Sequence, residues 1–497
     1  MSDRWMPCGL MADWLRQRAR THADRLALVC GHERLTFSAL DRLADRTAGQ
    51  MAAVGVAEGA RVAVLLRNGV PFVMVTHALA RLGATMVPLN TRLAPPELVW
   101  QIRDARAPFV VHDDDTDVSA LTGQVPGVQC LPWSAVTSVA PAKVVSRPAI
   151  ELATPQGIIY TSATTGRPKG VLLSFGNHWW SAVASVLNLG LRHDDRWLAP
   201  LPLFHVGGLA VLWRSVIYGI TAVVHETFDP ERLNHAIDDD GVTIVSVVST
   251  MLQRMLDARG NLPYPATLRC VLLGGGPAPR SLLERCLRLG VPVAPSYGLT
   301  EAASQVATLI PEDVGRKLGS AGKALFPTEV RVEDGEILVR GPTVMLGYIG
   351  RSEETARALR GGWLHTGDLG YLDEDGYLYV TERRDDLIVS GGENVYPAEV
   401  EAVLLSHPSV ADAGVVGLPD DEWGQVVAAA VQLRPDARAQ PEEVLAFVRE
   451  RLAGYKVPRR LWFTSELPRS PSGKVIRRML RAQIRAQAAG ATPGAGA

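Results

Sequence analysis

The sequence predicts an α/β fold: a large N-terminal domain of several subdomains, with layered α/β sheets and a β-rich part, and a small α+β C-terminal domain. Three observations support this prediction. Apolar runs of strand length alternate with helical segments, hairpin signals follow residue 325, and a separate block of strands and helices begins after Arg383. The 497 residues also exceed the size at which one hydrophobic core usually stops growing, so we expect at least two domains.

The first part of the chain repeats a strand followed by a helix. It opens with a helix at 36–51, where Ser38 with Asp41 resembles a capping pair. Strand and helix segments then alternate at 61–66, 72–84, 85–90, 220–226, 231–240, 242–248, 251–260, 269–276 and 281–290. Repeated units of this kind indicate a layered α/β architecture with largely parallel sheets.

The later part of the chain changes character. The segments 329–341 and 370–383 each carry Glu-Asp-Gly between alternating strands, which predicts two β-hairpins. The final block reads as strand, helix, strand, strand and helix at 387–392, 397–407, 411–418, 426–433 and 441–453. This order is typical of a small α+β domain.

Composition excludes several classes of protein. Hydrophobic residues make up 47%, charged residues 21% and the net charge is −1, which argues against disorder, nucleic-acid binding and a polybasic membrane patch. No apolar run reaches the roughly 18 residues of a membrane span, and the N-terminus does not resemble a signal peptide. The five cysteines are widely spaced without a CxxC pair, which argues against a disulfide framework or zinc site and fits a reducing cytoplasm.

The strongest local motif is YTSATTGRPKGV, residues 160–171. Hydroxyl side chains, a glycine and a lysine are concentrated here: Thr161, Ser162, Thr164, Thr165, Gly166 and Lys169. Such a loop can direct N–H groups and hydroxyls at phosphate oxygens, while Lys169 supplies charge. The spacing does not match the Walker pattern. The alternative is a polar surface loop, which leaves the preceding strand and the following Pro-Lys-Gly unexplained.

This segment resembles the phosphate loop of the acyl-adenylate-forming superfamily, which includes acyl–CoA synthetases, luciferases and peptide-synthetase adenylation domains. One departure is Ala163, where glycine is usual. Further similar segments follow in the family's order: LLGGGPAP at 272–279, SYGLTE at 296–301, WLHTGDLG at 363–370, the hinge segment at 376–401 and PRSPSGKVIRR at 468–478. Each alone could be an ordinary turn or charged surface, but their shared order identifies the chain as a member of the superfamily.

The resemblance implies an ATP site. The nucleoside would be held by Gly275, Gly276, Pro277, Tyr297, Gly298, Asp368 and Arg383. Thr300 would lie near the α-phosphate and Glu301 would bind Mg²⁺. An aromatic face suits a base and a carboxylate suits a hard cation. Lys474 falls at the catalytic lysine, and with Lys169 it would offset the charge of two approaching anions.

The resemblance also implies a second step, in which coenzyme A takes the acyl group from its adenylate. A mobile C-terminal domain would rotate about Asp385, which gives expected domains of 1–384 and 385–497. The residues expected to border coenzyme A are Ser390, Gly391, Gly392 and Trp423. The expected ligands are thus ATP, Mg²⁺, coenzyme A and a carboxylic acid, with no nucleic acid and no membrane insertion; a homo-oligomer is left open.

The choice of acid is expected to be set between about residues 200 and 310, which include the segment 201–219 and Leu299. His205 falls at the family's gating aromatic, although a structural histidine is the alternative, and Gly208 lies beside it. Arg214 interrupts an apolar run, so it either extends to solvent or pairs with an anion such as a second substrate carboxylate.

The strings GGGPAP and LGSAGK…LFP are similar to those of the o-succinylbenzoate–CoA ligases of menaquinone biosynthesis, whose acid carries two carboxylates. The alternatives are a medium-chain, aryl or malonyl–CoA synthetase, transfer of the acyl group to a carrier protein, and a non-catalytic nucleotide-binding relative. Lys474, Glu301 and Asp368 argue against the last.

Overall fold

The computed structural model describes residues 9–143, 149–161, 168–276, 278–383, 387–435, 437–468 and 475–490. Its contacts divide the chain into a large unit (1–91, 99–160 and 170–382) and a small unit (92–98, 161–169 and 383–497). Both units combine helices with sheets, which confirms the α/β fold class. No helix within these described ranges is long and apolar enough to cross a bilayer.

The first sheet of the large unit is built from βα units. Its strands are β4 (Arg61–Leu65), β5 (Thr85–Pro88), β6 (Phe109–His112), β7 (Gln129–Pro132), β9 (Pro155–Thr161), β10 (Lys169–Ser174) and β20 (Gly347–Tyr348). The helices along this part of the chain are α2 (Phe37–Ala53), α3 (Val70–Leu82), α4 (Pro95–Ala105), α5 (Ser119–Gln124) and α6 (Trp133–Ser138). The strand order is β20-β10-β9-β5-β4-β6-β7, parallel from β9 to β7, with β20 antiparallel to β10 at one edge.

The second sheet of the large unit repeats this plan. Its strands are β2 (Leu26–Cys30), β3 (Glu33–Thr36), β11 (Arg196–Ala199), β12 (Thr221–Val224), β13 (Ile244–Val247), β14 (Cys270–Leu273), β15 (Val293–Leu299), β16 (Ser304–Thr308) and β17 (Lys323–Ala324). The helices are α7 (Phe175–Leu189), α8 (Val206–Tyr218), α9 (Pro230–Asp238), α10 (Ser249–Arg259) and α11 (Arg280–Arg288). In the order β17-β16-β15-β14-β13-β11-β12-β2-β3, the strands from β15 to β2 are parallel and both edges are antiparallel.

Both predicted hairpins are confirmed in a third, antiparallel sheet. Its strands are β18 (Glu329–Glu333), β19 (Glu336–Arg340), β21 (Leu359–Arg360), β22 (Trp363–Leu372) and β23 (Leu378–Arg383). Asp334 and Gly335 both have positive φ, +49° and +79°, as a two-residue type I′ turn requires. The remaining elements of the large unit are β1 (Leu10–Ala12), α1 (Trp14–Thr21), β8 (Ala149–Glu151) and α12 (Ser352–Ala358).

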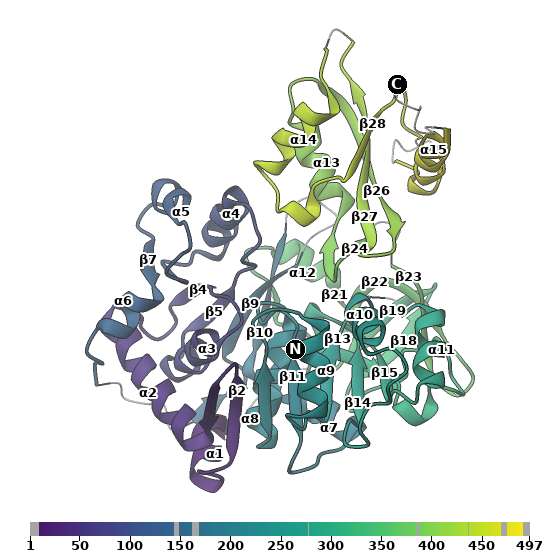
Figure 1. Ribbon diagram of the computed structural model, residues 1–497. Coiled ribbons are helices and arrows are strands. Elements are labelled where there is room, and N and C mark those ends of the chain that lie inside the picture. The colour runs from purple at the N-terminus through teal and green to yellow at the C-terminus, as the bar shows by residue number, and fades with distance from the viewer. Residues whose placement is uncertain are drawn as a thin grey trace. The chain divides into compact units, whose positions relative to one another are not determined.

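The small unit forms one sheet between helices. Its elements are β24 (Ile388–Ser390), β25 (Glu393–Val395), α13 (Pro397–Leu405), β26 (Val410–Asp420), β27 (Gly424–Leu433), α14 (Pro441–Arg449), β28 (Arg460–Phe463) and α15 (Arg477–Gly490). Alternating residues of β26 and β27 face opposite sides of the sheet: Val415 belongs to a core cluster with residues of α13 and α14, whereas Val416 belongs to one with residues of α15. Figure 1 shows α13 and α14 on one side of β26 and β27 and α15 on the other. The predicted α+β order is confirmed.

The predicted capping pair of α2, Ser38 with Asp41, was wrong, whereas the predicted start at residue 36 agrees with the structure. Thr36, not Ser38, is the N-cap, because it ends β3 in an extended conformation and its hydroxyl accepts the N–H of Ala39 at 3.2 Å. Ser38 lies inside the helix and accepts from Arg42 Nη1 at 2.6 Å. The Asp41 carboxylate is bonded to Arg81 and does not take part in capping.

Candidate functional site

The segment Tyr297–Glu301 runs from the end of β15 into a single 3₁₀ turn at Thr300–Ala302. Gly298 is required here, because a Cβ atom would lie 1.9 Å from the carbonyl oxygen of Ser304. Ala303 and Ser304 follow with φ of +51° and +98°, a strained backbone for residues other than glycine. The tight turn leaves Thr300 and Glu301 beyond the carboxyl end of a parallel strand, where α/β sheets usually bind ligands.

Tyr297 and Asp368 are brought together within the large unit. The Tyr297 hydroxyl donates to Asp368 Oδ2 at 2.7 Å, and both side chains are buried. The Asp368 N–H donates to Thr366 Oγ1 at 3.0 Å, which fixes the backbone of β22 at this position. An aromatic ring next to a buried carboxylate provides one group for a base and another for sugar hydroxyls.

Glu301 lies beside a tyrosine that the sequence reading missed. Tyr348 on β20 donates its hydroxyl to Glu301 Oε1 at 3.0 Å, and the Met345 N–H donates to the Glu301 carbonyl at 2.8 Å. Across the described ranges no group of three or more His, Cys, Asp or Glu side chains could hold a metal. A lone carboxylate fits Mg²⁺, which usually binds one or two carboxylates together with substrate phosphates and water.

Only some of the other residues predicted to bind ATP lie within the described ranges. Thr161 ends β9, Lys169 begins β10 and Arg383 ends β23. Gly275 has φ of +81° and follows β14, the strand next to β15. Gly276 is the last described residue before a gap. The predicted residues outside the described ranges are Ser162, Ala163, Thr164, Thr165, Gly166, Pro277, Asp385 and Lys474.

The residues predicted to bind the acid lie at the start of α8. His205 occupies the N-cap position and its ring centroid is 4.5 Å from that of Phe204. A Cβ on Gly208 would lie 2.3 Å from the Pro202 carbonyl oxygen, so close backbone packing explains this glycine. Leu299 ends β15 and is half-buried.

Arg214 is fully buried, at 2% exposure, so it does not extend to solvent. Its Nη2 donates to Ser181 Oγ at 3.1 Å and its guanidinium lies 5.5 Å from the centroid of the Trp197 ring, while Nε has no partner. None of the ion pairs among the described residues includes Arg214. Burial lowers the pKa of this arginine. A buried cation without a carboxylate is costly, and Nε, unbonded among the described residues, is a donor that an anion could use.

The residues predicted to border coenzyme A lie together in the small unit. Ser390 ends β24 and is buried, and Gly391 and Gly392 follow with φ of +57° and +85°. The Gly391 N–H donates to the Trp423 carbonyl at 2.9 Å. The Arg459 guanidinium lies 4.8 Å from the centroid of the Trp423 ring. The arrangement offers an aromatic surface and a positive charge beside a glycine turn.

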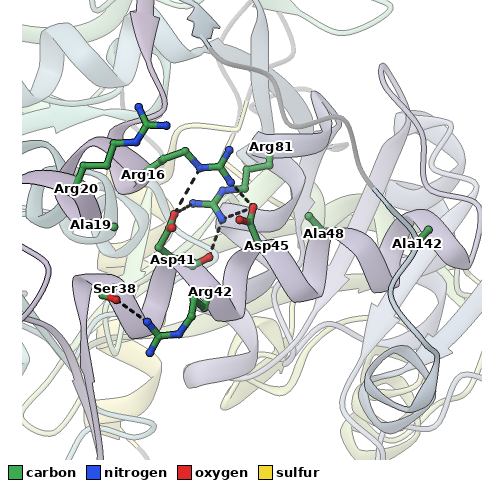
Figure 2. A pocket seen from close by; sticks show the side chains of 10 residues that line it. All are labelled: Arg16, Ala19, Arg20, Ser38, Asp41, Arg42, Asp45, Ala48, Arg81 and Ala142. Atoms are coloured by element: carbon green, nitrogen blue, oxygen red, sulfur yellow. Dashed lines mark hydrogen bonds and ion pairs between the residues drawn. The ribbon is translucent and has the colours of Figure 1, made fainter.

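A surface hollow of about 580 Å³ lies apart from the residues predicted for the site (Figure 2). The buried Arg81 side chain lines this hollow and forms ion pairs with Asp13, Asp41 and Asp45. The inner charges are therefore paired with one another, and the cluster joins α1, α2 and α3. We interpret it as structural.

The chain is similar to known proteins over nearly its whole length. Residues 15–349 match the AMP-binding enzyme family, and residues 399–474 match the AMP-binding enzyme C-terminal domain. The chain is 50% identical over 485 residues to the 2-succinylbenzoate–CoA ligase of Geobacillus kaustophilus, covering 95% of this chain and 98% of the relative. It is 47% identical over 481 residues to that of Bacillus cereus strain Q1, with the same coverage.

Two solved structures of o-succinylbenzoate CoA synthetase from Bacillus subtilis are similar, each at 43% identity and covering 95% of this chain. A double mutant bound with the product analogue OSB-NCoA has a TM-score of 0.92 and is covered to 98%. The complex with ATP and magnesium ion has a TM-score of 0.75 and is covered to 100%. An amide bond synthetase from Marinactinospora thermotolerans is 30% identical with a TM-score of 0.86, covering 95% of this chain and 99% of that one.

Proposed function

The chain belongs to the family of AMP-binding enzymes, and from this premise we propose that it is an ATP-dependent 2-succinylbenzoate–CoA ligase of menaquinone biosynthesis. In the first step a carboxylate oxygen of the acid attacks the α-phosphorus of ATP, forming an acyl-adenylate and releasing pyrophosphate. In the second step the thiol of coenzyme A attacks the acyl carbon and AMP leaves. The relatives' complexes with ATP, magnesium ion and a CoA product analogue support these co-substrates.

The state of Arg214 is the observation that supports 2-succinylbenzoate as the acid. Its guanidinium is buried and has no carboxylate partner among the described residues. An acid with two carboxylates would present one for activation and the other to this arginine. A charge-assisted hydrogen bond away from bulk water is among the stronger polar contacts in proteins, so the second carboxylate would be a main source of specificity.

Tyr297, Thr300, Glu301 and Asp368, which are assigned to the nucleotide and its metal ion, belong to the large unit. Tyr297 would face the adenine, and Asp368 and Arg383 would contact the ribose. Mg²⁺, when bound at Glu301, would neutralise charge on the phosphates. Lys169 and Lys474 would add positive charge where the carboxylate and the α-phosphate approach, and Thr300 would orient that phosphate. Catalysis of this kind consists of positioning and charge stabilisation.

For the second step we assign coenzyme A to the small unit. Ser390, Gly391 and Gly392 would border the pantetheine arm and Trp423 would lie against it. Asp385 would be the hinge between domains 1–384 and 385–497, and His205 would gate the acid pocket. A cytoplasmic location is part of the proposal, because ATP and coenzyme A are both available there.

The test is an assay of pyrophosphate release and thioester formation over a panel of acids, with and without coenzyme A. We expect 2-succinylbenzoate to give the highest kcat/KM among aromatic, medium-chain and malonate-like acids, and thioester to form only with coenzyme A present. A higher kcat/KM for another acid would overturn the choice of substrate, and pyrophosphate release without thioester formation would overturn the ligase activity.

The matched variant is Arg214→Ala. We expect it to raise KM for 2-succinylbenzoate by about tenfold or more, because a hydrogen bond to a charged group contributes about 1.5–3 kcal/mol. KM for ATP should change little. The control is Arg61→Ala, since Arg61 is also an arginine of the large unit but donates to a backbone carbonyl, that of Ala105. Equal increases in KM for the acid and for ATP would contradict the role of Arg214.

A further inference from the structure

Helices α7 and α8 share a buried polar seam. On α7, His178, Ser181 and Ser185 are spaced three and four residues apart and so lie on one face. On α8, Arg214 and Tyr218 are four residues apart in the same way. All five side chains are buried. Burying polar groups between two helices costs free energy unless the groups are hydrogen-bonded. Packing alone therefore does not explain why five polar side chains line this interface.

Ser181 is the most connected residue of the seam. Its hydroxyl accepts a hydrogen bond from Arg214 Nη2 at 3.1 Å and donates one to the Ala303 carbonyl at 2.7 Å. Within the described part of the chain it is the only hydrogen-bond partner of Arg214. One hydroxyl thus fixes one edge of the guanidinium. Arg214 Nε, which has no partner, is left as a donor for an anion.

The second partner of Ser181 belongs to the turn that follows Glu301. Ala303 has φ of +51°, and its N–H donates to the Thr300 carbonyl at 3.1 Å. A left-handed alanine is held only by its surroundings, and the bond from Ser181 is one of the contacts that hold it. The same side chain therefore contacts the arginine assigned to the acid and the turn assigned to the α-phosphate and the metal ion.

We propose that Ser181 is a positioning residue for acid specificity: it orients Arg214 toward the second carboxylate of the acid and ties that arginine to the turn at Thr300–Ala303. The inference rests on the proposed function, because it takes the ligand of Arg214 to be that carboxylate. Ser181 itself does not contact the acid. It acts by removing rotational freedom from a guanidinium that would otherwise have no hydrogen bond to the protein among the described residues.

The experiment compares Ser181→Ala with Ser185→Ala. Ser185 is the control because it is equally buried on the same face of α7 but makes no bond to Arg214. We expect Ser181→Ala to raise KM for 2-succinylbenzoate about fivefold to tenfold. Both kcat and KM for ATP should change by less than about twofold, because the turn keeps its backbone bond from the Ala303 N–H to the Thr300 carbonyl. For an analogue that keeps only the activated carboxylate, KM should not change. Ser185→Ala should leave all these constants unchanged.

Two further variants keep the inference falsifiable. Ser181→Cys is nearly isosteric but bonds weakly, so it should give an intermediate KM even where the alanine variant folds poorly. Ser181→Ala combined with Arg214→Ala should add no increase in KM beyond that of Arg214→Ala alone. Equal increases for the dicarboxylate and its analogue, or equal effects of Ser185→Ala, would overturn the positioning role.

The two proposals fail in different ways. If Arg214→Ala leaves KM for the dicarboxylate unchanged, the acid site itself is wrongly assigned. If Arg214→Ala raises that KM and Ser181→Ala does not, the acid site stands and only the role of Ser181 is overturned.

Discussion

At the scale of single residues, Gly391 is one of the most constrained positions of the small unit. Its φ of +57° is left-handed, and an added Cβ would lie 2.6 Å from Trp423 Cε3. The left-handed backbone alone costs a residue with a Cβ about 1–2 kcal/mol. An alanine here would therefore displace the Trp423 ring or reshape the turn after Ser390.

The variant Gly391→Ala should separate the two half-reactions. We expect thioester formation from the adenylate to slow by about tenfold or more, because small misplacements of a binding group are costly, while pyrophosphate release changes less than about twofold. Single-turnover assays with and without coenzyme A measure both. The control is Gly376→Ala, which has a similar φ of +79° but no atom within 4 Å of the added Cβ. Equal slowing of both half-reactions would argue against a role in coenzyme A binding.

Some residues of the candidate site could be predicted from the sequence, whereas their contacts could not. Tyr297 and Asp368 were predicted separately and prove to be hydrogen-bonded, although 71 positions separate them. Ser181 and Tyr348 were not predicted. The spacing of Ser181 in its helix and of Tyr348 in a two-residue strand does not show which residue each one bonds, and their partners lie 33 and 47 positions away in the chain. Only the folded chain reveals such pairs.

At the scale of elements, the short strand β20 connects two motifs of the proposed ATP site. The Leu346 N–H donates to the Leu172 carbonyl and the Ile349 N–H to the Gly170 carbonyl, at 3.0 and 2.9 Å, which holds this segment against β10. From the same segment, Tyr348 donates to the Glu301 carboxylate. The strand that follows the proposed phosphate loop and the proposed metal ligand are thus linked through β20.

The variant Tyr348→Phe tests this connection. Without the hydroxyl, the Glu301 carboxylate loses one bond that orients it, and we expect the Mg²⁺ concentration at half-maximal activity to rise about tenfold, as is typical when a group orienting a metal ligand is removed. KM for the acid should change little. The measurement is a Mg²⁺ titration of pyrophosphate release at saturating ATP.

Tyr264→Phe is the matched control, because that hydroxyl donates to Asn234 Oδ1, a residue outside the predicted site. An unchanged Mg²⁺ requirement in Tyr348→Phe would show that β20 is purely structural. A similar rise in Tyr264→Phe would point to a general loss of stability.

Elements were predicted well where periodicity is strong. The βα units at 220–290 and both hairpins follow from alternation and turn residues alone. The prediction of the N-cap of α2 was wrong because serine and threonine both favour this position, so Ser38 and Thr36 were both candidates. The extended backbone that makes Thr36 the N-cap depends on the pairing between β2 and β3. The antiparallel edges β16, β17 and β20 could not be predicted, since strands of two to five residues pair through tertiary contacts.

At the scale of the whole molecule, two of the buried histidines of the large unit lie against the same tryptophan in the core. His77 on α3 and His178 on α7 both approach the Trp213 ring, with centroid distances of 5.4 and 6.1 Å. Burial, with Arg81 nearby, lowers the pKa of His77 to about 4, and burial, with Arg214 nearby, lowers the pKa of His178 to about 3. Both rings are therefore neutral in the folded protein at neutral pH.

These two histidines should make the fold sensitive to acid. An unfolded histidine has a pKa of about 6.5, so below that pH the unfolded chain binds protons that the folded chain does not. The contribution of the two neutral histidines to the free energy of unfolding is therefore fully present above about pH 6.5. As the pH drops below that value, the free energy of unfolding falls by up to about 1.4 kcal/mol per pH unit for each histidine. Between about pH 6 and 4.5 the pair should contribute a slope of roughly 2–3 kcal/mol per unit.

Urea unfolding at a series of pH values measures that slope. His77→Gln and His178→Gln should each reduce it by about 1 kcal/mol per pH unit, whatever their effect on stability at pH 7. Leu79→Ala on α3 is the control: it removes buried apolar volume and no ionisable group, so it should lower stability equally at every pH. If the slope of unfolding free energy against pH is unchanged in both histidine variants, the two rings can be protonated in the folded protein. Water would then reach His178, and the interface between α7 and α8 would be more open than the burial of His178 indicates.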